Sequence, residues 1–530
     1  MTGSSSLNAR RRARELAELA EHPRIDVLVV GGGITGTGVA LDAASRGLSV
    51  VLAERHDLAY GTSRWSSKLV HGGLRYLARG ELGIAYESAV ERGLIMARLA
   101  PHLTRALPMV LPWLPRQRRG DGPSRRLATA GLIAGDMLRR VARTGRDTLP
   151  RYRRLTQAEV LTEVPALRRD VTGGLLGWEG QLTDDARLVV AVARTAAAHG
   201  ARILTRCEAS ELTSGGVVLT DRLTGQSFGV RAGAVINASG VWAGQLVPGV
   251  ELRPSRGTHL VLPDELFGGL RAGIVVPVPG ERARGVFALP VPGEQRVYAG
   301  LTDEPVTGPP PGVPEPSEAE IAFLLEVLGR ALEIPASRSD VLGAFAGLRP
   351  LLAGPHGSTA DLSRRHAILT SPDGVITVVG GKLTTYRRMA QDAVDAALQS
   401  APLAASGRPA GPSRTRQLPL AGAAGRHALA RVAAPRRLVA RYGTEAPAIA
   451  ALGEKNPALS KPVADGIPVI GAEIAFALLN EGALSEDDVL DRRTRIGLVP
   501  ADRERALPAA RRLLDELPAP SRPEQARALQ

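Results

Sequence analysis

The stretch from Asp26 to Glu54 constrains the fold of this chain more than any other. A short apolar run, Val27 to Val30, is followed by glycines in the spacing GxGxxG, an alanine-rich helical segment through Arg46, and a second apolar run at 49–53. Glycines at these positions permit a tight turn, a close approach to a pyrophosphate and close packing of helix on strand. The stretch therefore predicts a complete βαβ unit of the dinucleotide-binding kind.

Glu54 stands at the end of the second predicted strand, where a carboxylate accepts hydrogen bonds from ribose hydroxyls. Because the unit lies near the N-terminus of a 530-residue chain, FAD is a better candidate than NAD. A glycine-rich turn without a ligand is the alternative, and the joint presence of strand, helix, second strand and acid disfavours it. The predicted cofactor-binding residues of this unit are Gly31, Gly32, Gly33, Ile34, Thr35, Gly36 and Glu54.

Length and composition limit the number of domains, the possible partners and the cellular compartment. A chain of this length is expected to form two or three domains. The formal net charge of +14 suits acidic small molecules, anionic lipid or nucleic acid, and a compositional habit explains it equally well. Cys207 is the only cysteine, so disulfides and cysteine-based metal sites are excluded, and no metal site is predicted. No apolar run approaches the roughly 20 residues that span a bilayer, and the N-terminus lacks the apolar core of a secretory signal. We expect a cytoplasmic protein.

A second informative stretch, 58–77, concentrates hydrogen-bond donors and glycines beside the βαβ unit. An ordinary polar connection would rarely carry so many, and a loop that wraps a cofactor explains them better. Its predicted cofactor-binding residues are Thr62, Ser63, Ser66, Ser67, Lys68, His71, Gly72 and Gly73, and they are followed by Arg75 and Tyr76.

The motifs GGGITGTG, SSKLVHGGLRYL, TDDARLV, GLRPL and GGKLTTYR together resemble those of the FAD-dependent glycerol-3-phosphate dehydrogenases, from about residue 24 to about residue 500. The resemblance implies non-covalent FAD and oxidation of sn-glycerol 3-phosphate to dihydroxyacetone phosphate, with hydride passing from C2 to flavin N5 and electrons going on to a quinone. It also implies that Arg75, Arg349 and Arg364 bind the phosphate, as guanidinium groups can do bidentately, while Tyr76 and Lys382 orient the glycerol part.

Further site residues follow from the same resemblance. His259, on an alternating segment, is the predicted base, because a neutral imidazole accepts a proton near pH 7. His71 is the second choice. The turn with Ser239 and Gly240 returns the chain to the cofactor. A second strand, glycine and helix unit contributes Gly381, Lys382, Leu383 and Thr384, and its helix N-terminus would stabilise negative charge on the reduced flavin. Arg365 stands where the family has Asp, so it is left out of the site.

The expected fold is α/β: a Rossmann-like FAD-binding domain with an inserted antiparallel β-sheet substrate domain and an all-helical C-terminal domain. We expect a basic N-terminal tail at 1–23 and an oxidoreductase region at 24–400, with FAD-binding parts at about 24–110, 180–250 and 340–400 and a substrate part at about 251–340. A linker at 401–414 and a helical cap at 415–530 follow. Helical periodicity is expected through 80–110, and Asp184 with Asp185 is expected only to cap the next helix.

An arginine-rich stretch, 116–156, holds twelve Arg and three Asp around one apolar face, formed by Leu127, Ile133, Met137, Leu138 and Val141. This pattern is typical of a helix on an anionic membrane, at the inner face of the cell membrane in this case, and of a solvated helix as well. Rival functions are an oxidase that uses oxygen and an amine or amino-acid oxidase of the same flavin fold. A basic nucleic-acid-binding protein is disfavoured because no interleaved stacking aromatics occur, and no nucleic-acid partner is predicted. The sequence leaves the oligomeric state open, a homodimer included.

Overall fold

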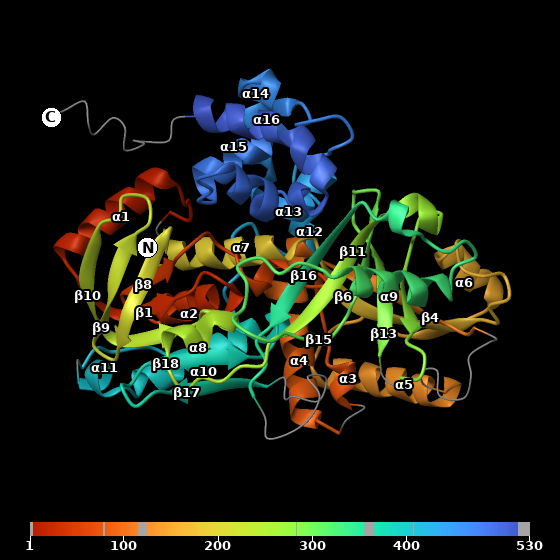
Figure 1. The fold of residues 1–530 in the computed structure, drawn as a ribbon, viewed down its shortest axis with the longest axis horizontal. Coiled ribbons are helices and arrows are strands. Elements are labelled where there is room, and N and C mark those ends of the chain that lie inside the picture. The colour runs from red at the N-terminus through yellow and green to blue at the C-terminus, as the bar shows by residue number, and fades with distance from the viewer. Residues whose placement is uncertain are drawn as a thin grey trace.

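The computed structural model describes residues 4–77, 80–114, 124–281, 284–353, 365–405 and 407–517. Figure 1 shows two sheets side by side and a group of C-terminal helices above them. The expected α/β fold with a second, β-rich domain and a helical C-terminal domain is confirmed.

The first sheet is built around β1 (Arg24–Val30), which pairs in parallel with β2 (Val50–Glu54) and β10 (Ser227–Asn237). Its order is β17 (His366–Thr370), β18 (Ile376–Gly380), β10, β1, β2 and β7 (Arg202–Thr205). The first half of β10 pairs instead with β9 (Gly216–Asp221), which pairs with β8 (Cys207–Thr213). The carboxyl ends of β1, β10 and β18 therefore meet at one edge, where such sheets bind ligands.

Both faces of this sheet are covered, as the continuous apolar sequence of β1 requires. Helices α2 (Ile34–Ser45), α7 (Asp185–Ala198) and α10 (Tyr386–Leu398) bury Val27 and Val29 on one face. On the other face Leu28 and Val30 lie beneath α1 (Ala9–Glu21) and the β8–β9 ribbon.

The described part of the expected basic N-terminal tail, 4–23, contains a helix. Residues 9–21 form α1, and Arg12 is buried in an ion pair with Asp221 of β9. Ahead of the helix, Leu7 donates its N–H to Asn480 O at 2.9 Å and accepts from Gly482 N. The amphipathic pattern with Leu19 at its centre explains why the segment docks rather than extends.

The second sheet extends beyond the expected 251–340. Residues 104–112, expected within a helical stretch, form a strand, and 174–182 and 343–349 also join this sheet. Its order is β15 (Glu304–Pro305), β11 (Ser255–Pro263), β14 (Arg296–Gly300), β13 (Gly285–Pro290), β12 (Gly273–Pro277), β4 (Thr104–Pro112), β6 (Gly174–Leu182) and β3 (Leu69–Val70), with β16 (Gly343–Arg349) on β11 and β5 (Arg153–Leu155) on β6. All pairs are antiparallel except β4 with β12. Helices α6 (Gln157–Glu163) and α9 (Glu318–Gly329) pack on it.

Three helices form the underside of the molecule in Figure 1: α3 (Leu74–Leu77), α4 (Leu82–Leu94) and α5 (Arg125–Val141). The inner side of α5 packs against α3 and α4 through Leu138. Its other apolar residues, Leu127, Ile133, Met137 and Val141, are exposed by 61%, 49%, 65% and 59%. In the described part of the chain no helix is long and apolar enough to cross a membrane.

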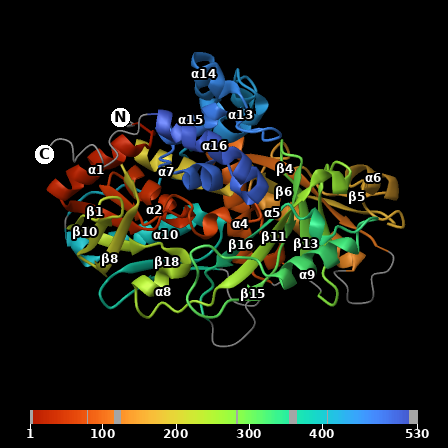
Figure 2. The same ribbon diagram turned by 45° about the horizontal axis from the view of Figure 1, so that its top comes forward.

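The C-terminal helices, blue in Figures 1 and 2, lie over α7. They follow a connecting segment that begins with α11 (Ala401–Ala405) and lies on α2, where Ser413 and Thr415 donate to Asp42. The helices are α12 (Arg426–Leu429), α13 (Arg436–Tyr442), α14 (Ala446–Lys455), α15 (Gly471–Asn480) and α16 (Pro500–Glu516), with a π-helical turn at Asp488–Arg493. The described part of 415–517 is helical with connecting turns, as expected.

Candidate active site

The turn after β1 has the close contacts that a bound pyrophosphate needs. Gly31 has φ +112°, in the region that favours glycine, and a Cβ there would lie 2.6 Å from Ala238 O. A Cβ on Gly36 would lie 1.9 Å from Gly31 O, so the helix can approach the turn only without a side chain. Gly33 is the N-cap of α2 and has no side chain to cap it, so the positive helix end can stabilise an anion beside Ser63, which accepts from Ile34 N.

Glu54 is held where a ribose would be bound. Its Oε2 accepts from Gly32 N at 2.6 Å and its Oε1 from His56 N at 2.7 Å. Burial raises the pKa of this carboxyl, and the two backbone N–H groups act against that shift. Each oxygen has a further lone pair for a ribose hydroxyl. The donor set and the glycine turn fit the adenosine and pyrophosphate of FAD.

Residues 62–68 lie against this turn. Ser63 Oγ accepts from Ile34 N at 2.9 Å, and Thr62 Oγ1 donates to Leu348 O at 2.7 Å. The predicted loop thus joins the first helix of the nucleotide unit to β16 of the second sheet.

Asp185 holds the next part of this loop, a role that the sequence expectation of capping alone missed. Asp184 is the cap, accepting from Ala186 N at 2.8 Å. Asp185 Oδ2 accepts from Ser66 N at 2.9 Å, Ser66 Oγ at 2.7 Å and Lys68 Nζ at 2.8 Å. Burial lowers the pKa of Lys68 to about 8 against the opposing effect of Asp185. The Lys68 ammonium therefore stabilises the conformation of the loop to which Lys68 itself belongs. No sequence signal separates the two adjacent acids.

The end of β18 borders the candidate cofactor site on a third side, after the β1 turn and residues 62–68. Gly380 and Gly381 have φ of +74° and +72°, and the helical turn 383–385 leads into α10. Thr384 Oγ1 accepts from His71 N at 3.1 Å, which brings together two predicted flavin segments. At the end of β10, Ser239 donates to Asn237 Oδ1 and lies beside Gly31.

His259 connects the second sheet to the cofactor loop. Its Nε2 lies 2.8 Å from Ser67 Oγ, and its ring stacks on Phe345 with centroids 4.8 Å apart. Burial first, and then the charges of Lys68 and Arg349, lower the pKa of His259 to about 3. The imidazole is therefore neutral, and its buried Nδ1 has no hydrogen-bond partner among the described residues.

Arg349 lies near His259 at the end of β16. Its Nη1 donates to Asp303 Oδ1 and to Ser255 Oγ, both at 3.1 Å, and its Nη2 donates to Thr302 O at 3.0 Å. The sequence did not indicate this acidic partner. Asp303 fixes the guanidinium in one orientation, so an anion here would share it with a carboxylate.

Lys382 and Tyr76 form a separate contact. Lys382 Nζ lies 3.7 Å above the centre of the Tyr76 ring and donates to Ser88 Oγ at 3.0 Å. Arg364 lies outside the described residues, as does the side chain of Arg75. Two clusters of predicted residues are thus seen: Ser67 with His259 and Arg349, and Tyr76 with Lys382.

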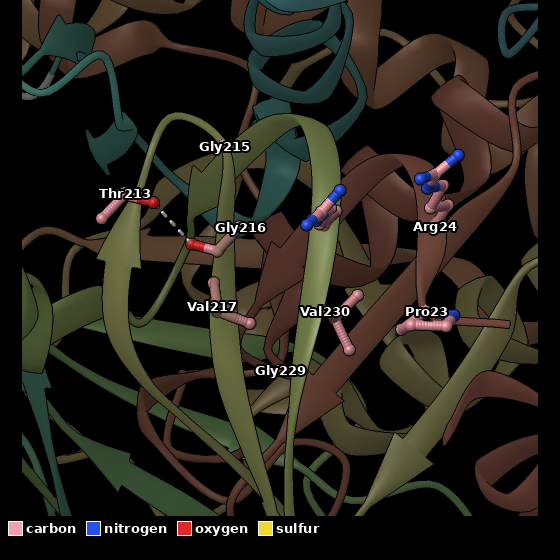
Figure 3. A pocket seen from close by; sticks show the side chains of 9 residues that line it. Pro23, Arg24, Thr213, Gly215, Gly216, Val217, Gly229 and Val230 are labelled. Atoms are coloured by element: carbon pink, nitrogen blue, oxygen red, sulfur yellow. Dashed lines mark hydrogen bonds between the residues drawn. The ribbon is translucent and has the colours of Figure 1, made fainter. Parts of the chain in front are cut away.

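A surface pocket of about 580 Å³ lies elsewhere, beside the β9–β10 hairpin (Figure 3). Arg24 lies at its upper right in Figure 3, and Arg231 is its partner on the neighbouring strand. It contains no predicted site residue. Its lining consists of Pro23, Arg24, Thr213, Gly215, Gly216, Val217, Gly229, Val230 and Arg231.

Comparisons with known proteins identify the family of this chain. Residues 26–387 match the family model of the FAD dependent oxidoreductases, and residues 413–519 match the C-terminal domain of alpha-glycerophosphate oxidase. Glycerol-3-phosphate dehydrogenase 1 of Mycobacterium tuberculosis is 54% identical over 525 residues, which cover 97% of this chain and 99% of that protein. The mitochondrial glycerol-3-phosphate dehydrogenase of Arabidopsis thaliana is 35% identical, over 92% of this chain and 81% of its own.

Among solved structures, the glycerol-3-phosphate dehydrogenase of Bacillus halodurans complexed with FAD matches with a TM-score of 0.72 and 27% identity, over 96% of this chain and 94% of that one. L-alpha-glycerophosphate oxidase of Mycoplasma pneumoniae, at 18% identity, a TM-score of 0.53 and 71% and 94% coverage, shows a shared fold. The chain therefore belongs to the FAD-dependent glycerol-3-phosphate dehydrogenase family, and FAD is its cofactor.

Proposed function

We propose that the enzyme oxidises sn-glycerol 3-phosphate to dihydroxyacetone phosphate. The observation that carries the proposal is the 54% identity, over nearly the full length of both chains, to a protein named for this dehydrogenase activity. When bound, FAD supplies the hydride acceptor, at N5 of its ring. The cluster of Ser67, His259 and Arg349 supports the proposal, because it places a neutral nitrogen base and a fixed cation beside the cofactor loop.

Arg349 is proposed to bind the substrate phosphate. A dianion near this guanidinium gains a charge-assisted contact, worth about 1.5–3 kcal/mol. Since Asp303 also bears negative charge, one guanidinium cannot balance both Asp303 and the phosphate. We propose that Arg75 and Arg364 provide the further positive charges. Tyr76 and Lys382 are proposed to orient the glycerol part, with the ammonium held over the ring.

His259 is proposed to take the hydroxyl proton. In the tautomer with its proton on Nε2, the ring donates to Ser67 Oγ and leaves the lone pair of Nδ1 available. Because burial and the charges of Lys68 and Arg349 disfavour the imidazolium, the ring must then pass the proton on. His71 is the alternative base.

Anaerobic mixing with glycerol 3-phosphate tests the proposal directly. We expect the visible flavin absorbance to bleach at once, and glycerol at the same concentration to leave it unchanged. A flavin that is bleached by amino acids, and not by the phosphate ester, would assign the chain to amino-acid oxidation. Re-oxidation by a quinone supports the proposed acceptor, and equal re-oxidation by air supports the oxidase alternative.

We also propose that the enzyme is a peripheral protein at the inner face of the cell membrane. The exposed apolar residues of α5, together with exposed Arg140 and Arg143 near its end, support this contact. Arg139 does not take part, because it is buried against Asp136 and donates to Thr144 O at 2.6 Å. A lipid-soluble quinone is reached only at a bilayer, which gives such a contact a chemical reason.

A further inference from the structure

The cofactor loop, defined here as residues 57–68, is held by two separate parts of the chain. One side is fixed by Asp185 at the start of α7, which accepts from Ser66 and Lys68. The other side contacts the C-terminal domain, at the end of the π-helical turn 488–493 and just after it. The C-terminal domain itself contributes none of the site residues predicted from the sequence.

The first contact is a buried ion cluster on Asp57, three residues after Glu54. Arg492 Nε donates to Asp57 Oδ2 at 2.7 Å, and Arg493 donates to both carboxylate oxygens at 2.8 Å. Arg492, Arg493 and Asp57 are all buried. The two guanidinium groups hold the pKa of Asp57 far below its usual range despite the opposing effect of burial. Such a cluster fixes the start of the loop.

The second contact is on the backbone in the middle of the loop. Arg495 Nη2 donates to Arg64 O, and Lys68 Nζ donates to the same carbonyl at 3.0 Å. The guanidinium of Arg495 also lies 5.3 Å from the ring centre of Trp65. One carbonyl of the loop therefore accepts from two cations, of which one belongs to the loop and the other to the C-terminal domain.

The groups that face the predicted chemistry lie between these anchors. Ser63 Oγ accepts from the first N–H of α2, and Ser67 Oγ is paired with His259. A displacement of the loop by about 1 Å would break both contacts, and errors of that size cost large factors in rate.

We propose that Arg493 and Arg495 are positioning residues through which the C-terminal domain sets the geometry of the cofactor loop. The proposal rests on the family's FAD site and on the proposed function, and it goes further by giving the C-terminal domain a part in cofactor binding. Arg495 makes the more useful test, because its direct contact with the loop is to a backbone carbonyl and its buried acidic neighbour Asp184 keeps Arg441 as a partner. Arg493, by contrast, donates to both oxygens of the buried Asp57 carboxylate.

The experiment compares full-length, FAD-loaded Arg495→Met and Arg495→Lys with wild type and with Arg505→Met. Arg505 is a matched control on α16 of the same domain, where it pairs with Asp502 and donates to Asp465 O. For each protein we would measure the FAD dissociation constant, the visible circular dichroism of the bound flavin, the thermal midpoint, and kcat and KM for glycerol 3-phosphate.

We expect Arg495→Met to weaken FAD binding roughly tenfold, the effect of losing one charge-assisted hydrogen bond, and to alter the flavin dichroism. We expect kcat to fall more than KM rises, Arg495→Lys to recover part of each change, and Arg505→Met to match wild type. Wild-type FAD affinity and dichroism in Arg495→Met would overturn the proposal.

If Arg495→Met does not fold, the proposal is tested instead by the rate of backbone amide hydrogen exchange in Arg495→Lys. Faster exchange of peptides within 57–68 than in Arg505→Met supports the proposal, and equal exchange refutes it. If wild type does not oxidise glycerol 3-phosphate, the proposed function fails, but the FAD-binding and exchange measurements still test the positioning role.

Discussion

His259 Nε2 lies 2.8 Å from Ser67 Oγ, so the predicted base on the second sheet is hydrogen-bonded to the loop that wraps the cofactor on the first. The two residues are 192 positions apart in the chain. Their contact fixes the plane of the imidazole, which Phe345 supports from one face. In the proposed mechanism, proton transfer and cofactor placement are coupled through the hydroxyl of Ser67.

Replacing His259 by Gln should lower kcat by about 10²–10⁴ while FAD content stays that of wild type, because a positioned base contributes a factor of this size. Ser67→Ala should lower kcat less, since the ring is disoriented but present. Stopped-flow flavin reduction measures both. Wild-type reduction by His259→Gln would transfer the role of base to another group, with His71 the first to examine.

Stability should decrease as the pH falls below about 6.5, because two buried histidines are neutral in the fold. Burial lowers the pKa of His102 and of His259 to about 3 each. Their folded pKa values lie below the unfolded value, so unfolding takes up protons between pH 3 and 6.5. Each histidine then removes up to about 1.4 kcal/mol of stability per pH unit over that window.

Thermal midpoints measured from pH 7.5 to 4.5 test this expectation. The midpoint should fall as the pH decreases below about 6.5, and His102→Gln should make that fall less steep, while Lys68, whose pKa burial lowers to about 8, affects the range above about pH 7. Arg187 adds to the shift at His102, and the lowered carboxyl pKa of Asp57 affects only more acid pH. An unchanged slope in His102→Gln would show that this histidine does not titrate on unfolding.

Glu54→Gln should weaken FAD binding by about 1–3 kcal/mol. The amide has one acceptor oxygen, whereas both carboxylate oxygens accept backbone N–H groups from Gly32 and His56. In Glu54→Gln one of those backbone N–H donors would face the side-chain NH₂ group, which cannot accept a hydrogen bond. Fluorescence titration of the apoprotein with FAD gives the change, and an affinity equal to wild type would remove Glu54 from the cofactor site.

Arg349→Ala should lower kcat/KM for glycerol 3-phosphate by roughly 10–100-fold, mainly through KM, because a charge-assisted phosphate contact is lost. Arg349→Lys should recover only part, since the planar fork that also binds Asp303 is missing. Steady-state kinetics with a soluble dye would show this. An unchanged KM would place the phosphate elsewhere.

Changing Arg140 and Arg143 to Glu should reduce binding to vesicles that contain anionic lipid and reduce quinone-linked activity, while activity with a soluble dye is spared. Arg511→Glu with Arg512→Glu is the control, since both side chains are exposed on α16. Binding should also weaken at 1 M salt, where the screening length is about 3 Å. Equal vesicle binding by both double variants would contradict a role for α5.

The nucleotide unit could be predicted because its information is local. Glycine spacing, a buried strand and a helix with period 3.6 are all present within thirty residues, and the structure confirms β1, α2 and β2. The strand at 104–112 could not be recognised, since Pro108 and Pro112 follow a helix and disfavour a strand. The two prolines, four positions apart, lack an N–H on the same side of the strand, and β4 still pairs with β6 along its whole length and with β12 at Met109 and Val110.

Contacts between distant segments were beyond prediction for a different reason. Asp57 and Arg493 are separated by 436 positions, and Arg349 and Asp303 by 46. The spacing of charged residues along the sequence does not indicate which residue pairs with which. The sequence also has more arginines than acidic residues, so each acidic residue has many possible partners. Family resemblance predicted a role for Arg349, and only the fold showed that Asp303 orients its guanidinium.

The pairing of Leu7 with residues 480 and 482 has a consequence for synthesis of the chain. A ribosome adding about 5–20 residues per second needs roughly 25–95 s to extend the chain from one partner to the other. During that interval the backbone groups of Leu7 lack their partners, whereas α1 can already dock on β7–β10 once residue 237 has been made. The same delay applies to Asp57 and its arginines. The contacts between the cofactor loop and the C-terminal domain can therefore form only after nearly the whole chain has been synthesised. Premature termination within the last helices should then yield a product that binds little flavin.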